Sequence, residues 1–244
     1  MNETMRLLLD HRSIRKYTDE IIPPEMIETI LKAAQMAPTS SNYQSYSILE
    51  VKDPEKRKIL RDISGDQEWV EKAPLVLLFM ADLSRGRDYF EAIDTEILGN
   101  TESFTVAVVD AALAMEKALI AAQSLGLGGV IVGGIRNDVA RVAALFDMPS
   151  LVFPMALLCL GYPAEDPGTK PRLPLSEVLH VDRYDVRDRQ RYIEAYNEEM
   201  EAYYFERTQG AKRRTWTRHS GKSLMAKDRD AVGYFLRRHG FLKK

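Results

Sequence analysis

The sequence is poor in cysteine: its 244 residues include only Cys159. A single cysteine cannot form an internal disulfide, so no disulfide framework holds this chain, and a reducing compartment such as the cytoplasm is indicated. Cys159 stands in the apolar run M-A-L-L-C-L-G. Cationic neighbours favour a catalytic thiolate, and this run has none, so we predict a buried, inert thiol.

Long uninterrupted hydrophobic runs are also absent. A membrane-spanning helix needs about 20 consecutive apolar residues, and the longest apolar-rich stretch, residues 104–125, contains Asp110, Glu116 and Lys117. The first ten residues, M-N-E-T-M-R-L-L-L-D, carry early charges in place of a secretory apolar region. We therefore expect no membrane anchor and no secretory signal.

Metal-binding and nucleophile motifs are missing as well. The four histidines are scattered, no H-x-x-x-H or C-x-x-C pair occurs, and there is no G-x-S-x-G elbow. A glycine-rich stretch, S-L-G-L-G-G at 124–129, follows a predicted helix and precedes a predicted strand. The dinucleotide-binding fingerprint has the reverse order, which argues against that interpretation.

Hydrophobic periodicity and end signals predict a mixture of helices and strands. Strands are expected at 45–51, 74–81, 130–132 and 153–160. Helices are expected at 2–10, from Pro23-Pro24 to before Pro38, from an Asp53 cap, at 104–126, from an Asn137 cap through Phe146, at 187–208 and at 226–238. The proline-rich loop 161–174 is the only plausible linker. We predict one α+β domain over residues 1–244, with a helical excursion and extension over roughly 175–244.

The helix predicted at 104–126 carries small apolar residues around most of its circumference: Val106, Ala107, Val109, Ala111, Ala112, Ala114, Ala118, Ala121 and Ala122. A helix that is apolar on nearly all sides is either a central core helix or a subunit interface. This pattern supports the prediction of a homodimer.

Charge is unevenly distributed along a chain whose formal net charge is −2. Residues 207–244 contain twelve Lys or Arg and two acids, a net charge of +10, so the remainder carries −12. A basic tail on an acidic body indicates either an anionic ligand or partner, or a solvated tail that pairs with the body. The acidic body, and the lack of a basic platform interleaved with aromatic residues, argue against a nucleic-acid binder.

Two short cationic clusters favour phosphate binding. The first is H-R-S-I-R at 11–15, and the second is Lys170-Pro171-Arg172, where prolines 171 and 174 restrict the backbone. Guanidinium groups bind phosphate oxygens through paired, charge-assisted hydrogen bonds. Either cluster alone is better explained by surface salt bridges, whereas two convergent clusters would neutralise a phosphomonoester.

Five motifs in order resemble the flavin-dependent nitroreductase family: H-R-S-I-R-K-Y, P-T-S-S-N-Y-Q, G-D-Q-E-W, G-L-G-G-V-I-V-G-G-I-R-N and K-P-R-L-P. The chain is most similar to the NADPH-preferring branch of oxygen-insensitive nitroreductases and bacterial flavin reductases. This resemblance covers almost the whole chain, including Y-Y-F-E-R-T-Q-G-A-K-R-R-T-W. It implies a central, mostly antiparallel sheet flanked by helices, with a C-terminal helical extension that embraces a dimer partner.

The resemblance also implies FMN at a dimer interface. Four matched residues would hold its phosphate and ribityl chain, an amide would bind the polar edge of the ring, glycines would lie against the ring, and the partner subunit would contribute a hydroxyl-rich loop. One of a further cationic pair is expected near the flavin N1–C2 edge, where a cation stabilises reduced flavin. In chain order, the implied residues are His11, Arg12, Ser13, Arg15, Thr39, Ser40, Ser41, Gln67, Val132, Gly133, Gly134, Lys170 and Arg172.

Three further cations, Arg207, Lys212 and Arg213, match the branch's residues for the NADPH 2′-phosphate; a solvated turn is the alternative. The implied activity is ping-pong transfer of two electrons from NADPH through FMN to nitroaromatics, quinones, free flavin or oxygen. No dedicated catalytic side chain is implied, because the flavin carries the chemistry. The alternatives are an NADPH oxidase or FMN reductase that supplies reduced flavin, and a nucleotide-binding protein without turnover.

Overall fold

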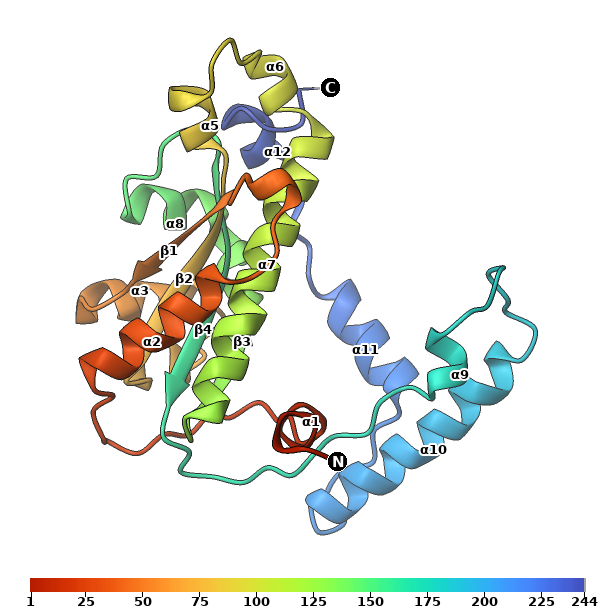
Figure 1. Ribbon diagram of the computed structural model, residues 1–244. Helices are drawn as coiled ribbons and strands as arrows, with labels where there is room; N and C mark the ends of the chain where they lie inside the picture. The colour runs from red at the N-terminus through yellow and green to blue at the C-terminus, as the bar shows by residue number, and fades with distance from the viewer. Residues whose placement is uncertain (244) are drawn as a thin grey trace. The chain divides into compact units, whose positions relative to one another are not determined.

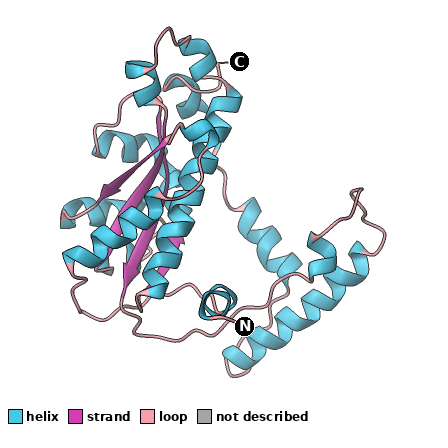
Figure 2. Cartoon of the chain, in the orientation of Figure 1, coloured by secondary structure: helices cyan, strands magenta, loops and turns pink. Residues whose placement is uncertain are grey.

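A computed structural model describes residues 1–243 and contains a four-stranded sheet in the order β1-β2-β4-β3 (Figures 1 and 2). The strands are β1 (Tyr46–Glu50), β2 (Leu75–Asp82), β3 (Gly128–Val132) and β4 (Val152–Gly161). All three pairings are antiparallel. The four predicted strands and the antiparallel sheet are thus confirmed, with ends that differ by at most two residues.

Helices pack on both faces of the sheet. Leu75, Leu77 and Phe79 of β2 belong to the core cluster formed with α2 (Pro24–Gln35) and α7 (Thr101–Ser124). The alternate residues Val76, Leu78 and Met80 pack instead with α3 (Pro54–Ile63) and α8 (Val139–Leu145). Because successive side chains of a strand point to opposite faces, a strand covered on both sides must be apolar throughout, as L-V-L-L-F-M-A is.

Side-chain caps determine where several helices begin. Asp53 caps α3 as predicted, since its Oδ1 accepts a hydrogen bond of 2.9 Å from the amide of Glu55. Asn100 caps α7 in the same way, which starts that helix three residues before the predicted position.

The predicted cap of α8 is wrong. A 3₁₀ helix, η2, occupies Gly133–Asp138, so Asn137 is already within a helix. The cap is its neighbour Asp138, whose Oδ1 accepts the amide of Arg141 at 3.1 Å. The side-chain Nδ2 of Asn137 donates instead to the carbonyl of Ile63 at 3.0 Å, which ties η2 to the end of α3.

The chain divides into two compact units: residues 1–167 with 229–244, and residues 168–228. The first unit contains the sheet and the shorter helices α1 (Glu3–Leu9), α4 (Trp69–Lys72), α5 (Ser84–Tyr89) and α6 (Thr95–Leu98). It also contains α12 (Asp230–Arg238), which begins four residues after the predicted start at 226. Phe235, Leu236 and Phe241 are buried in the core of this unit.

The second unit consists of α9 (Leu175–Val178), α10 (Arg189–Arg207) and α11 (Trp216–Met225). The predicted helix at 187–208 corresponds to α10, whereas α11 was not predicted. Its sequence, W-T-R-H-S-G-K-S-L-M, lacks an apolar repeat, and none of its residues is buried. Contacts with α10 hold it: the Trp216 ring lies 6.0 Å from that of Tyr196, and the Thr217 amide donates to Asn197 Oδ1 at 3.0 Å. Across residues 1–243, no helix is both long and apolar enough to cross a membrane.

Candidate functional site

The cationic segment at 11–15 runs beside the sheet edge formed by β3. The amide of Ile14 donates to the carbonyl of Gly129 at 3.0 Å, and the Tyr17 hydroxyl donates to the carbonyls of Ile14 and Cys159 at 2.8 and 3.1 Å. Burial raises the pKa of Tyr17 well above its usual value, so its hydroxyl stays a neutral donor. The His11 ring lies 3.2 Å from the Gln123 amide. The segment is therefore fixed to the sheet before any ligand binds.

Arg12 is neutralised by carboxylates. Its Nη1 lies 2.6 Å from Asp10 Oδ1 and its Nε lies 2.9 Å from Asp166 Oδ1. These three side chains and Glu165 line a groove of about 310 Å³. A phosphate group at Arg12 would have to displace one of its acidic partners.

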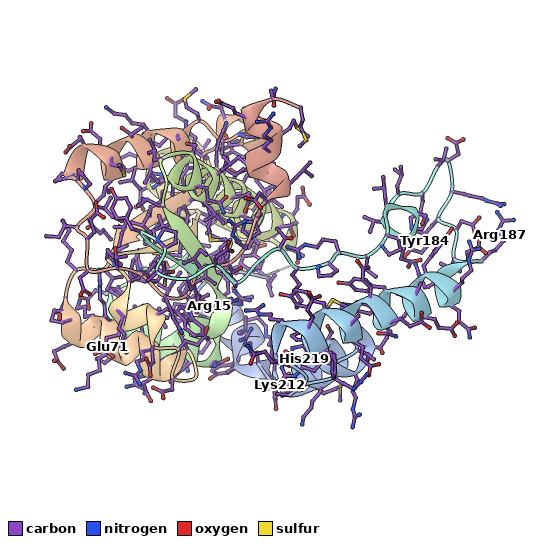
Figure 3. All side chains as sticks on the ribbon, turned by 90° about the horizontal axis from the view of Figure 1, so that it is seen from below. Arg15, Glu71, Tyr184, Arg187, Lys212 and His219 are labelled. Atoms are coloured by element: carbon purple, nitrogen blue, oxygen red, sulfur yellow. The ribbon has the colours of Figure 1, made fainter. Side chains whose placement is uncertain are left out.

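Arg15 has a different environment. Its guanidinium carbon lies 5.5 Å from the centre of the Trp69 ring, and its Nη1 donates to the carbonyl of Ser13 at 3.2 Å. Glu165 accepts the backbone amide of Arg15 at 2.9 Å, but among residues 1–243 no carboxylate pairs with its guanidinium. An aromatic ring positions a cation without cancelling its charge, so the charge of Arg15 remains available to an anion. Figure 3 labels Arg15.

Gln67, Ser64 and Gly134 form a cradle. The Gln67 Nε2 donates to the carbonyl of Ser64 at 2.6 Å, which leaves the side-chain oxygen of Gln67, Oε1, as a free acceptor within the described chain. A Cβ at Gly134 would lie 2.8 Å from both Gln67 Nε2 and the Ser64 carbonyl oxygen, so a side chain at this position would disturb the cradle. Two buried polar atoms here, Ser64 Oγ and Trp69 Nε1, have no hydrogen-bond partner in residues 1–243. A polar ligand or water would satisfy such groups.

Gly133, the neighbour of this cradle, is covered by a guanidinium. A Cβ at Gly133 would lie 2.7 Å from Arg136 Nη2. Arg136 itself donates to the carbonyl of Met155, and desolvation lowers its pKa below the usual value. Val132, just before these glycines, is buried in the core and offers its backbone only.

The loop with Thr39, Ser40 and Ser41 is held by a buried aspartate on α7. Asp110 accepts the amides of Ser40 and Ser45, each at 3.1 Å. Ser41 has a φ of 46°, in the left-handed region that few non-glycine residues adopt, and Asn42 and Gln44 follow with 57° and 52°. This role of Asp110 was not predicted, although an acid flanked by apolar residues on both sides, as in V-V-D-A-A, is a recognisable signal for it.

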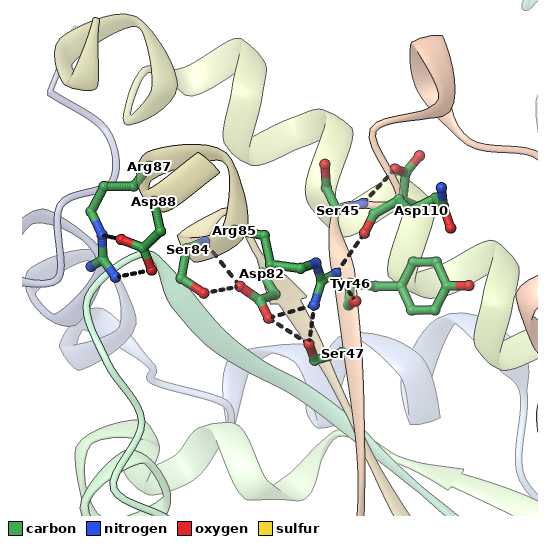
Figure 4. A network of polar contacts seen from close by, with 10 residues as sticks. Ser45, Tyr46, Ser47, Asp82, Ser84, Arg85, Arg87, Asp88 and Asp110 are labelled. Atoms are coloured by element: carbon green, nitrogen blue, oxygen red, sulfur yellow. Dashed lines mark hydrogen bonds and ion pairs between the residues drawn. The ribbon is translucent and has the colours of Figure 1, made fainter. Parts of the chain in front are cut away.

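A second polar network lies beside this loop (Figure 4). Asp82 accepts the Ser84 amide at 2.9 Å and the Ser47 hydroxyl at 2.5 Å, and Arg85 Nη2 donates to the carbonyls of Gln44 and Tyr46 at 2.7 and 2.5 Å. A hollow of about 870 Å³ opens here between α2, the loop, β1 and α5. The network ties the end of the loop and the start of β1 to α5, and so restricts the motion of the loop.

In the second unit, the predicted pair Lys170 and Arg172 is anchored to α10. Lys170 Nζ lies 5.4 Å from the centre of the Tyr204 ring, and Arg172 Nη1 donates to the carbonyl of Lys170 at 2.8 Å. The Tyr196 hydroxyl donates to the carbonyl of Pro171 at 2.9 Å and fixes the loop between them. Neither cation has a carboxylate partner among residues 168–228.

The predicted coenzyme cations Arg207, Lys212 and Arg213 lie at the end of α10 and in the turn that follows. Arg207 Nη1 donates to the Tyr203 hydroxyl at 2.6 Å. Arg213 rests on the Phe205 ring at 4.3 Å and lies 3.2 Å from Glu201 Oε1. Figure 3 labels Lys212 in this turn and His219 on α11. All three cations thus belong to the end of α10 and the turn after it, and their role at a coenzyme phosphate stays a prediction.

The chain belongs to the nitroreductase family. The family model matches residues 8–162, and the model of the family's C-terminal domain matches residues 170–244. The chain is 40% identical to FMN reductase (NADPH) of Bacillus subtilis, over 248 aligned positions that cover all of both chains. It is 37% identical to the oxygen-insensitive NADPH nitroreductase of Salmonella typhimurium, over 99% of each.

Solved structures agree with this membership. The NfrA1 nitroreductase from B. subtilis superposes with a TM-score of 0.96 at 39% identity, over 99% of this chain and all of that one. The NADPH:FMN oxidoreductase from Vibrio harveyi, solved in complex with NAD⁺, superposes with a TM-score of 0.90 at 34% identity over all of both chains. The predicted nitroreductase-like α+β fold is thereby confirmed.

Proposed function

We propose that this chain is an FMN-dependent NADPH oxidoreductase of the nitroreductase and flavin reductase type. The observation that carries the proposal is the cradle of Gln67, Ser64 and Gly134 beside the unpaired Arg15. Relatives that match the full chain are named FMN reductase (NADPH), NADPH nitroreductase and NADPH-flavin oxidoreductase, which supports the same activity here.

The described residues suit both ends of FMN, its phosphate and its ring. Arg15 offers an uncompensated charge for the phosphate, and Gln67 presents a carbonyl oxygen that would accept a ring N–H. The glycines at 133 and 134 let the backbone approach a flat ring. Lys170 and Arg172 are the second cationic pair proposed for this ligand, with His11, Arg12, Ser13, Thr39, Ser40, Ser41 and Val132 as further contacts.

Bound FMN would supply the redox chemistry, taking up two electrons and a proton from NADPH and giving them to an acceptor. The chain itself supplies binding and orientation. Gln67 is oriented by its hydrogen bond to Ser64, so its acceptor atom is set before a ligand arrives. Arg15, on the Trp69 ring, and Arg136, beside Gly133, add positive charge to this region, which favours an anionic group there.

The coenzyme proposal is that Arg207, Lys212 and Arg213 contact the 2′-phosphate of NADPH. NADH lacks this phosphate, so cations at these positions would raise the affinity for NADPH selectively. We also propose a homodimer, supported by exposed Val109 and Leu113 on α7. Dependence on NADPH and the single buried thiol favour the cytoplasm as its location.

The acceptors proposed are nitroaromatics, quinones, free flavin and oxygen. Relatives named as an FMN reductase and as a nitroreductase support free flavin and nitro compounds among them. Acceptor kinetics would separate a nitroreductase from an oxidase or FMN reductase that supplies reduced flavin. The comparison is kcat/KM for a nitroaromatic, a quinone, free FMN and oxygen at one NADPH concentration.

The decisive experiment is the visible spectrum of the purified protein, followed by anaerobic addition of NADPH or NADH. A flavin absorption that bleaches faster with NADPH would support the cofactor, the reductive half-reaction and the coenzyme preference together. Arg15→Ala should weaken FMN binding by about 1.5–3 kcal/mol, the range for a lost hydrogen bond to a charged group. No flavin absorption, and no FMN uptake on reconstitution, would refute the proposal.

A further inference from the structure

The buried carboxylate on α7 serves one loop. Asp110 is 1% exposed, and its two side-chain oxygens accept the backbone amides of Ser40 and Ser45, each at 3.1 Å. Figure 4 shows Asp110 beside Ser45. No Lys, Arg or His among residues 1–243 forms an ion pair with it. A buried charge is costly unless other groups compensate it, and within the described chain the side-chain hydrogen bonds of Asp110 go to the loop 39–45 alone.

The backbone of this loop has to be enforced by its surroundings. Three of its non-glycine residues have a positive φ, between 46° and 57°: Ser41, Asn42 and Gln44. Such conformations cost free energy and persist only where neighbouring structure determines them. At the start of the loop Asp110 accepts the Ser40 amide, and at its end the Asp82 amide donates to the Ser45 carbonyl at 3.0 Å. The loop is therefore fixed from both sides.

The side chains on this fixed backbone remain available. Ser40 and Ser41 are exposed, and the hydroxyls of Thr39, Ser40 and Ser41 form no hydrogen bond within residues 1–243. The short 3₁₀ helix η1 (Ser40–Asn42) has no side-chain cap from Thr39, so Asp110 takes the place of a cap by accepting its first amide. A rigid backbone that presents unpaired hydroxyls loses little conformational entropy when a ligand binds. The loop thus suits recognition of a polar ligand.

The loop and the cationic segment 11–15 lie at opposite corners of the sheet. The loop leads into Tyr46 of β1, which is in register, through β2, with Phe153 of β4. The segment meets β3 at Gly129, which pairs with Leu160 of β4. These corners are about 23 Å apart along β4 and about 14 Å apart across the sheet. The loop and the segment can therefore share one FMN phosphate only if they come from different subunits, as a twofold dimer allows.

We propose that Asp110 is a positioning residue for FMN: its carboxylate fixes the loop 39–45 in the conformation that contacts the FMN held by the partner subunit. This inference rests on the proposed function and on the proposed homodimer. Exposed Val109, the neighbour of Asp110 on α7, belongs to the face proposed to meet the partner. One helix would thus link subunit association to FMN binding.

The first test is fluorescence titration of the full-length protein, freed of FMN, with FMN. Asp110→Asn keeps the shape of the side chain but turns one acceptor into a donor that faces a loop amide. We expect FMN binding to weaken by at least about tenfold, as for a lost charge-assisted hydrogen bond, and hydrogen exchange to accelerate at the Ser40 and Ser45 amides. Glu102→Gln, the same kind of change at an exposed position of α7, is the matched control and should behave like wild type.

Ser40→Pro tests the same contact from the loop and leaves the buried carboxylate in place. It removes the amide that Asp110 accepts at the first residue of η1, where proline is tolerated. Thr39 already has the extended backbone that a following proline requires, with a φ of −131° and a ψ of 151°. Ser40→Ala removes the hydroxyl alone, so Ser40→Pro should bind FMN about tenfold more weakly than Ser40→Ala. Equal affinities would overturn the inference.

A mixed dimer shows on which FMN the loop acts. An Asp110→Asn subunit is paired with an Arg15→Ala subunit, and the mixed species is isolated with two different affinity tags. If the loop acts on the partner's FMN, one site carries both changes and the other carries neither, so one FMN per dimer should bind with wild-type affinity. If the loop acts within its own subunit, each site carries one change, both bind weakly, and the inference is wrong.

The outcomes also separate the inference from the proposed function. If wild type binds FMN and Asp110→Asn binds it equally well, the inference fails and the proposed function stands. If Asp110→Asn does not fold, the comparison of Ser40→Pro with Ser40→Ala decides. If wild type takes up no FMN, the proposed function itself fails.

Discussion

At the scale of single residues, Arg12 and Arg15 show how neighbours decide what a cation offers. Arg12 lies between Asp10 and Asp166, whereas Arg15 rests on the Trp69 ring. Both arginines look equivalent in H-R-S-I-R, because the carboxylate at 166 and the indole at 69 are distant in sequence. The motif predicts a cationic segment, and only the fold shows which of its charges is free.

Cys159 confirms the prediction of a buried thiol, and its chemistry can be tested. It is fully buried, and desolvation raises its pKa to about 12. At pH 8 only about one thiol in ten thousand would be ionised, whereas about a quarter of an unperturbed cysteine with a pKa near 8.5 would be. We expect no labelling by an aromatic disulfide reagent in the folded protein and one equivalent after denaturation. Met36→Cys, at an exposed position, is the control and should react at once.

His219 predicts a pH dependence of anion binding. Desolvation, followed by the charges of Arg214 and Lys170, lowers its pKa below the usual value, and Arg218 and Lys222 line the same pocket of about 450 Å³ beside α11. Without a bound anion the His219 ring is therefore neutral near pH 7, and binding of an anion should raise its pKa and cause uptake of a proton.

Affinity for 2′,5′-ADP, the part of NADPH that carries the 2′-phosphate, should then rise as pH falls from 8 to 6. The ligand's own phosphates lose charge over this range, so the measured quantity is the difference between wild type and His219→Gln. Isothermal titration calorimetry of 2′,5′-ADP binding, carried out in two buffers with different ionisation enthalpies, measures proton uptake. Wild type should take up protons on binding, and the variant should take up fewer. Identical proton uptake in both would contradict the assignment to His219.

At the scale of elements, the sheet is the part that the sequence predicts best. Both faces of β2 and β4 are covered, so these strands read as continuous apolar runs such as residues 75–81. The helix starts are less predictable, since Asp138 and not Asn137 caps α8. Helix α11 could not be predicted, because it is held by contacts with α10 and not by a local sequence pattern. Trp69 was part of a motif, yet its contact with Arg15 depends on how α4 packs.

The cradle predicts that Gly134→Ala disturbs the ring end of the site. The added Cβ would lie 2.8 Å from the Ser64 carbonyl and from Gln67 Nε2, so backbone or amide must move. Forcing a methyl group into a packed site costs about 1–3 kcal/mol, and we expect a loss of FMN affinity of that size. Gly233→Ala, where the new Cβ meets only Arg237 at 3.7 Å, is the control. Fluorescence titration with FMN measures both.

At the scale of the whole molecule, the homodimer proposed above would depend on the exposed side of α7. One side of that helix is packed against the sheet, whereas Val109 and Leu113 are 50% and 41% exposed. Burying an unpaired charge in an interface costs about 3–5 kcal/mol, so Leu113→Glu should raise the dimer dissociation constant by more than about a hundredfold. Sedimentation velocity across a concentration series checks this. Ile21→Glu, an equally drastic change at a site 83% exposed outside α7, should leave the sedimentation unchanged.

The second unit, residues 168–228, is an insertion, because the chain returns to the first unit after it. The returning segment contributes Phe235, Leu236 and the fully buried Phe241 to the core. Backbone hydrogen bonds also hold it, from the Leu151 amide to the His239 carbonyl at 2.8 Å and from the Lys243 amide to the Gly99 carbonyl at 3.2 Å.

A single protease cut within 168–228 would therefore separate the covalent chain but not the folded body. The short C-terminal fragment should remain bound as a native peptide, so that the nicked protein gives one band in a native gel and two under denaturing conditions. Two separately expressed pieces of such a protein should therefore reassemble, because the buried phenylalanines of the C-terminal piece complete the core of the other.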